Sequence, residues 1–165
     1  MLKKICNVLI GIIIICLLII ASALLLPGLF GYKSFAVISG SMEPGIPVGS
    51  IVYAKETPFD DLRIGDVISF SLSGDTKVTH RIAAVNQESQ SFTTKGDAND
   101  TEDGNPVNYQ NVIGKVALSI PFLGFLSVYI KTPLGIAAAC GIIFVLIILN
   151  FLPEVLEKDK EKTEK

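Results

Sequence analysis

The side chains in this 165-residue chain that could carry hydrolytic chemistry are a serine, one histidine and several carboxylates. Ser41 lies in the stretch SGSMEPG, residues 39–45, where proline and glycine prevent a helix or strand from continuing and leave the hydroxyl on a bend. His80 is the only histidine, and histidine is well suited to proton transfer near neutral pH. A serine becomes a nucleophile when such a base takes its proton.

The acidic stretch TTKGDANDTEDGN, residues 93–105, could supply the third group of a catalytic triad. A carboxylate there could orient the histidine and stabilise its charged form. Asp97 and Asp103 are the candidates, and the residues alone leave the choice between them open. The non-catalytic interpretation is a plain turn at Ser41, a His80 with a structural role and a solvated acidic loop. A calcium loop is a further alternative, but its spacing does not follow the EF-hand pattern, and we predict no metal site.

These residues lie between two long apolar stretches. The chain is 50% hydrophobic with a mean hydropathy of +0.54, which is more apolar than an ordinary soluble domain. Residues 5–32 and 132–153 carry no charge. Each is long enough to cross a hydrocarbon core about 30 Å thick, so we predict transmembrane helices at about residues 5–26 and 133–152.

The first apolar stretch has a competing interpretation as a cleavable signal peptide, because Lys3 and Lys4 precede it and Ala21-Ser22-Ala23 resembles a cleavage site. The apolar stretch continues past that point through Leu26, which favours an uncleaved anchor. The positive-inside tendency places both ends of the chain in the cytoplasm. The predicted organisation is therefore a cytoplasmic N-terminus and helix at 1–32, an extracytoplasmic domain at 33–131, a second helix at 132–153 and a charged cytoplasmic tail at 154–165.

The segment 33–131 has the composition of one small domain without disulfides. It holds eight basic and eleven acidic residues, a formal charge of −3, and lacks the concentrated basic face that nucleic-acid binding needs. Cys6, Cys16 and Cys140 all lie in the apolar stretches. The domain must therefore fold on its own hydrophobic core.

The same segment is predicted to be mainly β. Short runs rich in Val, Ile, Phe and Thr alternate with clusters of Gly, Pro, Asp and Asn, and no run has a helical period. The predicted strands are 34–39, 50–55, 66–72, 77–86, 91–96 and 111–118. Strands without intervening helices favour a small antiparallel sheet that is folded or closed into a barrel-like form. The apolar patch at 121–126 is expected either in the core or at the membrane interface.

Several motifs in this order resemble the type I signal peptidases, in particular the branch with a serine and a histidine that includes the endoplasmic-reticulum, archaeal and SipW-like enzymes. The matching stretches are SGSMEP (39–44), IGDVI (64–68), THRI (79–82), KGDAND (95–100) with Asp103, IGKV (113–116) and IPFLG (120–124). Together they cover nearly all of the segment 33–131.

The resemblance implies a role for each candidate residue. Ser41 is expected to be the nucleophile and His80 the general base. Asp103 is the expected partner of His80, with Asp97 as a second acidic residue that supports the site or substitutes for Asp103. The Ser39 hydroxyl and the Ser41 backbone N–H are expected to form the oxyanion hole.

The better-known bacterial branch uses a lysine base, but here His80 occupies the corresponding motif, so Lys77 and Lys95 are poor candidates for that role. The resemblance also implies small apolar pockets for the substrate, without saying which of several apolar side chains line them. The candidates for that lining are Phe35, Val37, Ile38, Ile51 and Val78.

The resemblance implies a membrane-bound serine endopeptidase that removes signal peptides from secretory preproteins after small residues at −1 and −3. It needs no cofactor. Expected partners are signal peptides, the lipid bilayer and secretion machinery or accessory subunits. The expected location is the plasma membrane, or the endoplasmic-reticulum membrane of a eukaryote, with two spans and the catalytic domain outside the cytoplasm. Alternatives are a related peptidase with one or few dedicated substrates and a non-enzymatic anchored β module.

Overall fold

The computed structural model describes residues 2–72 and 76–163, and the last two residues of the predicted tail 154–165 lie outside them. The chain divides into two compact units. One comprises residues 24–128 and contains the β domain. The other is made of the two terminal segments and contains most of the apolar helices α1 (Leu2–Leu29) and α3 (Pro133–Thr163).

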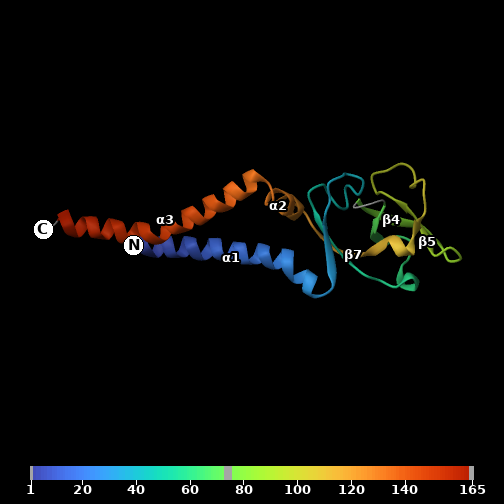
Figure 1. The fold of residues 1–165 in the computed structure, drawn as a ribbon, viewed down its shortest axis with the longest axis horizontal. Helices are drawn as coiled ribbons and strands as arrows, with labels where there is room; N and C mark the ends of the chain where they lie inside the picture. Colours follow the sequence, from blue (N-terminus) through green and yellow to red (C-terminus); the bar gives the residue numbers. More distant parts are fainter. Residues whose placement is uncertain (1, 73–75, 164–165) are drawn as a thin grey trace. The chain divides into compact units, whose positions relative to one another are not determined.

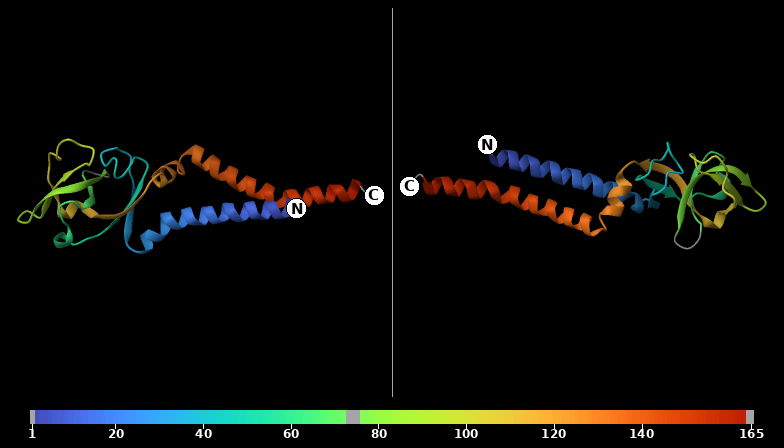
Figure 2. Two further views of the ribbon diagram at one scale, coloured as in Figure 1. Left: turned by 180° about the vertical axis from the view of Figure 1, so that it is seen from behind. Right: turned by 90° about the horizontal axis from the view of Figure 1, so that it is seen from above.

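Within the described residues, the β domain is built on one seven-stranded sheet of order β1-β2-β7-β3-β4-β5-β6, and every pair of neighbours is antiparallel (Figure 1). The strands are β1 (Tyr32–Ala36), β2 (Ile51–Lys55), β3 (Val67–Ser71), β4 (Lys77–Asn86), β5 (Ser91–Lys95), β6 (Val107–Asn108) and β7 (Val112–Ile120). The sheet curls strongly, as the views in Figure 2 show. The predicted mainly β fold is confirmed, although the sequence analysis missed the two-residue strand β6.

The register of β3 and β4 decides which way the histidine points. Phe70 pairs with Val78 and Ile68 pairs with His80, and side chains two residues apart share a face of a strand. His80 therefore shares a face with Ile68 and Phe70, and the Phe70 and His80 rings meet edge to face with centroids 6.3 Å apart. The other face carries Ser69 and Thr79, whose hydroxyls are hydrogen-bonded at 2.8 Å.

The domain has two clusters of buried apolar side chains. The larger one contains Phe59, Leu62, Ile68, Phe70, Ile82, Phe92 and Val107. The smaller one contains Met42, Ile46 and Val52, with Phe35, Val37, Val67 and Val116 packed against it. Met42 is only 1% exposed, so the residue directly after Ser41 is anchored in the core.

A short helix, α2 (Leu123–Tyr129), occupies most of the apolar patch that the sequence analysis left without a structure. Its first turn lies on the turn at Gly49, whose carbonyl accepts hydrogen bonds from the backbone N–H groups of Gly124 and Phe125 at 2.9 and 3.2 Å. Gly49 has φ +81°, and a Cβ there would collide with the Phe125 ring. The sequence analysis found no run with a helical period in 33–131 and so missed this helix, because seven residues are too few to show one.

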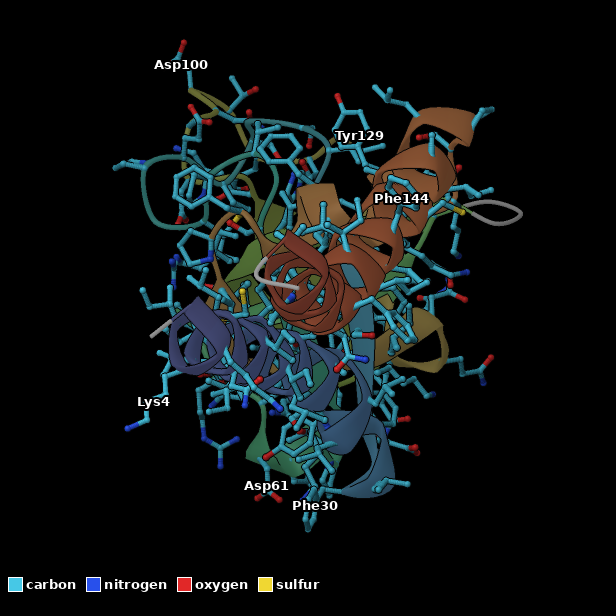
Figure 3. The ribbon with its side chains drawn as sticks, turned by 90° about the vertical axis from the view of Figure 1, so that its left-hand side faces the viewer. Lys4, Phe30, Asp61, Asp100, Tyr129 and Phe144 are labelled. Carbon is cyan, nitrogen blue, oxygen red and sulfur yellow. The ribbon has the colours of Figure 1, made fainter. Side chains whose placement is uncertain are left out.

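The terminal unit consists mainly of apolar helix. α1 and α3 lie side by side within this unit in both Figure 1 and Figure 2. In the described residues, Lys3–Leu29 and Pro133–Pro153 are long and apolar enough to cross a membrane, and neither apolar window is buried in the protein. Phe144 of α3, labelled in Figure 3, illustrates this exposure, because it is 63% exposed.

Replacing Met42 by alanine should test how strongly the core holds the Ser41 turn. Met42→Ala removes a side chain that is almost completely buried, so we expect a loss of about 2–5 kcal/mol in the free energy of unfolding of the β domain. Urea unfolding of the detergent-solubilised protein measures it. Ile64→Ala is the control, because Ile64 is 67% exposed and should lose less than about 0.5 kcal/mol. Equal losses in the two variants would contradict the anchoring role.

Candidate active site

The Ser41 turn begins after Val37 and Ile38, the two residues that follow β1. Residues 39–45 form bends and turns, in which the Glu43 backbone N–H donates to the Gly40 carbonyl at 3.0 Å and the Ile46 N–H to the Met42 carbonyl at 2.8 Å. Met42 and Ile46 are buried, whereas Ser41 is half-buried. The hydroxyls of Ser39 and Ser41 lie 3.3 Å apart. The predicted bend with an accessible serine is therefore present.

A second loop, residues 96–99 after β5, holds the backbone of Ser41. The Ala98 N–H donates to the Ser41 carbonyl at 2.9 Å. Gly96 lies so close that a Cβ on it would come within 2.6 Å of that carbonyl oxygen and 2.8 Å of Asn99 Nδ2. Only glycine leaves room for this contact. The glycine of the KGDAND motif thus allows the two loops to meet.

Asp97 fixes this loop through Arg81 rather than through the histidine. Arg81 Nε and Nη2 donate to Asp97 Oδ1 and Oδ2 at 2.8 and 2.7 Å, a bidentate pair. The hydrogen bonds to Asp97 raise the pKa of the Arg81 guanidinium further above its already high ordinary value. Arg81 also donates to the Gly65 carbonyl at 2.6 Å. One guanidinium therefore links the Asp97 loop to the turn before β3.

Asp103 is the carboxylate that contacts the histidine. His80 Nδ1–H donates to Asp103 Oδ2 at 2.6 Å, and the same oxygen accepts from Thr94 Oγ1 at 2.6 Å. The Asp103 backbone N–H donates to the Thr94 carbonyl at 2.8 Å. Thr94 is completely buried and His80 is only 8% exposed. The histidine ring is thus oriented by a carboxylate that is itself fixed by β5.

Ser41 and His80 line one cavity of about 290 Å³. Ser39, Lys77 and Asn99 add polar groups to its wall. Ser41 Oγ contacts Ser39 and, among the described residues, makes no hydrogen bond to His80. The apolar part of the wall comes from the end of β1, the residues after it and the start of β4. Four of the five apolar candidates for the substrate pockets line this wall, namely Phe35, Val37, Ile38 and Val78. The fifth candidate, Ile51, does not line it.

A second cavity, of about 450 Å³, is lined by both members of the histidine–carboxylate pair. His80 and Val78 line both cavities, and Asp103 and Phe70 line this one. Asp100, in contrast, is exposed and points away from the domain in Figure 3. The carboxylates of the acidic loop therefore have three different surroundings. Asp103 contacts the histidine, Asp97 pairs with Arg81, and Asp100 lies in solvent.

Three residues near the site were not given a role by the sequence analysis. Arg81 and Asn99 appeared only as members of motifs, and Thr94 only as part of a strand and at the start of the acidic stretch 93–105. The inward position of Thr94 could have been predicted, because Thr94 lies two residues from Phe92 in an alternating strand and its hydroxyl therefore shares the buried face with Phe92. The residue types alone did not choose between Asp97 and Asp103, although the resemblance favoured Asp103, because the choice depends on the course of the loop.

Comparisons with known proteins bear on this arrangement. No protein-family model matches the chain. The chain is 44% identical over 89 residues to signal peptidase I W of Bacillus subtilis, covering 52% of this chain and 47% of that protein. It is 28% identical over 120 residues to the signal peptidase complex catalytic subunit SEC11C of Rattus norvegicus, and 30% identical over 106 residues to SEC11 of Candida dubliniensis.

The match to SEC11C covers 64% of this chain and 62% of that protein, and the match to SEC11 covers 58% and 63%. The chain therefore spans about half to three fifths of the length of these relatives. All three are named as signal peptidases or as catalytic subunits of one, which is a class of hydrolase. The resemblance found in the sequence motifs is confirmed. Over the matched segments, the chain is similar to type I signal peptidases of the endoplasmic-reticulum and SipW-like branch.

The hydroxyl of Thr94 should contribute measurably to stability. Thr94→Val removes one donor from Asp103 Oδ2 at a buried position, so we expect a loss of about 1–3 kcal/mol in the free energy of unfolding. Thr93→Val is the matched control, because Thr93 lies on the opposite face of the same strand, and Thr94→Ser should retain most of the stability. Urea denaturation compares the three, and equal effects at positions 93 and 94 would refute the interpretation.

The Arg81–Asp97 pair should hold the loop against Ser41. Arg81→Lys keeps the charge but loses the two-pronged contact, so the Ala98 N–H should exchange with solvent faster, by roughly three- to tenfold. Amide hydrogen exchange followed by NMR measures it. Lys115→Ala is the control, since it removes another partly exposed ion pair, with Asp66, and should leave the Ala98 exchange rate unchanged. An unchanged rate in Arg81→Lys would show that the pair does not hold the loop.

Proposed function

We propose that this chain is a membrane-bound serine endopeptidase that removes signal peptides from secretory preproteins, with Ser41 as nucleophile and His80 as general base. The observation that carries the proposal is that Ser41 and a carboxylate-bound His80 line the same cavity. A histidine that served only to pack the domain would have no reason to share a cavity with an accessible serine hydroxyl. The names of the relatives support the reaction class.

The proposed chemistry begins with proton transfer. Asp103 accepts from Nδ1 of His80, which leaves Nε2 as the nitrogen that can take the proton of Ser41 Oγ. The oxygen then attacks the scissile carbonyl carbon and forms a tetrahedral intermediate. Its collapse breaks the C–N bond while His80 protonates the leaving amine. Water activated by the same histidine then hydrolyses the acyl-enzyme.

Asp103 would stabilise the imidazolium that forms during each proton transfer, and Thr94 would hold Asp103 in place for it. Asp97 would act as a supporting residue through Arg81 and the loop that binds Ser41. The expected oxyanion hole is the Ser41 backbone N–H with the Ser39 hydroxyl, which lies 3.3 Å from the Ser41 hydroxyl. Such donors are worth roughly 3–4 kcal/mol each in other acyl-transfer enzymes.

The cavity wall supports cleavage after small residues. An extended peptide could lie between the end of β1 and the start of β4, where it would place alternate side chains against Phe35, Val37 and Val78. A cavity of about 290 Å³ shared between two side chains and the scissile bond leaves little room at −1 and −3. We infer that alanine and residues of similar size fit best.

The two apolar helices support a location in a membrane. We propose that both span it, with the β domain on the extracytoplasmic side and both ends in the cytoplasm. A preprotein signal sequence would be held in the same bilayer, which raises its effective concentration at the site without any new contact. Secretion machinery or accessory subunits are proposed partners, since two relatives are named as subunits of a complex.

The test is cleavage of a secretory preprotein with an Ala-x-Ala site in detergent micelles. We expect wild type to cut after the second alanine, and Ser41→Ala and His80→Ala to lose at least about a thousandfold in kcat/KM. Circular dichroism and urea unfolding confirm that the variants are folded. Ser89→Ala is the control for a serine outside the cavity and should cut like wild type.

Each other result has a definite meaning. If His80→Ala still cuts the preprotein and Ser41→Ala does not, His80 is not the base, and a lysine becomes the candidate for that role. If folded wild type cuts no preprotein but reacts with a serine-directed fluorophosphonate, general signal peptide removal is excluded in favour of a dedicated substrate. If it does neither, the non-enzymatic β module is the better description.

A further inference from the structure

Asn99 is held beside the proposed nucleophile by the same loop that fixes the Ser41 backbone. Its backbone N–H donates to the Gly96 carbonyl at 3.0 Å, and its neighbour Ala98 donates to the Ser41 carbonyl at 2.9 Å. The Arg81–Asp97 pair also restrains the loop. The position of Asn99 relative to Ser41 is therefore set by the fold and not by a free loop.

The carboxamide of Asn99 lies in the wall of the cavity shared by Ser41 and His80. It is exposed, and within the described part of the chain it makes no side-chain hydrogen bond. A Cβ on Gly96 would lie 2.8 Å from Asn99 Nδ2 and 2.6 Å from the Ser41 oxygen. The bare backbone at Gly96 thus makes room both for the Ser41 turn and for this carboxamide.

The chemistry of the cavity suggests what the carboxamide binds. A carboxamide carries two N–H donors and a carbonyl acceptor, which complement the carbonyl and N–H of a peptide group. Small side chains at −1 and −3 offer nothing to hydrogen-bond, so the polar groups of the substrate near the cut are those of its main chain. Most of the other side chains in the wall are apolar or are the hydroxyls assigned to catalysis.

We propose that Asn99 is a substrate-binding residue whose carboxamide hydrogen-bonds the main chain of the peptide next to the scissile bond. This inference rests on the proposed function and adds to it a contact that neither the triad nor the oxyanion hole contains. It assigns Asn99 to binding and leaves Ser41 activation to His80 and Asp103. Loss of the carboxamide should therefore slow the cleavage of peptides, but it should not slow the reaction of Ser41 with reagents that have no peptide chain.

The experiment compares two reactions of the full-length protein in detergent micelles. The first is cleavage of a peptide with an Ala-x-Ala site, and the second is the reaction of Ser41 with a small alkyl fluorophosphonate. We expect Asn99→Ala to lower kcat/KM for the peptide by about three- to tenfold, the effect of about one neutral hydrogen bond. Its reaction with the fluorophosphonate should stay within about twofold of wild type, a difference too small for a lost hydrogen bond.

Two further variants sharpen the comparison. Asn99→Asp keeps the shape but replaces the donors by a charge, and it should cleave the peptide no better than Asn99→Ala. Asn108→Ala is the matched control, because Asn108 is an exposed asparagine of β6 that does not line this cavity. It should match wild type in both reactions. Urea unfolding should show unchanged stability in Asn99→Ala, whose side chain is exposed.

The possible failures are separable. If Asn99→Ala cleaves the peptide as fast as wild type does, the inference is overturned and the proposed function stands. If both reactions slow equally, Asn99 positions the nucleophile and does not bind substrate, which also overturns the inference. If wild type cleaves no such peptide, the proposed function itself fails, and the assignment of Asn99 fails with it.

Discussion

The hydrogen bond from the Ala98 N–H to the Ser41 carbonyl is the constraint on which the rest of the site depends. Ser41 follows β1, at one edge of the sheet, and Ala98 follows β5, next to the other edge. A flat sheet of this strand order would hold the two residues far apart, because neighbouring strands are about 4.8 Å apart. The sheet must curl to join them, and the curl brings Ser41 into the same cavity as His80 of β4.

The site combines a buried half with an accessible half. His80, Asp103 and Thr94 form a chain of short hydrogen bonds in which His80 and Thr94 are buried and Asp103 is partly exposed, and these bonds give the ring one preferred orientation. Ser41 is half-buried and accessible, but its neighbour Met42 is fixed in the core. A hydroxyl can therefore meet a substrate while its backbone stays in place, which is what preorganised catalysis requires.

Much of the fold followed from local patterns, because β-branched and aromatic residues between turn-forming clusters specify strands directly. The prediction missed β6 and α2, which are two and seven residues long and too short to show a period. At the site, Ser41 and His80 could be named from residue type and motif. The residues alone left the partner of His80 open and only the resemblance favoured Asp103, because Asp97 and Asp103 lie in one loop and its path in space separates them.

The surroundings of His80 and of Lys77 also explain why the proposed base is the histidine and not the lysine. A lysine can act as a base where burial disfavours its charge, whereas Lys77, which lines the cavity, is exposed and donates to Ser71 Oγ at 3.1 Å. His80 is buried and has a carboxylate on Nδ1, so its ring is oriented, and Nε2 is the nitrogen that we propose takes the proton of Ser41. The orientation of the proposed base therefore depends on the hydroxyl of Thr94 as well, because Thr94 donates to the carboxylate oxygen that holds the His80 ring.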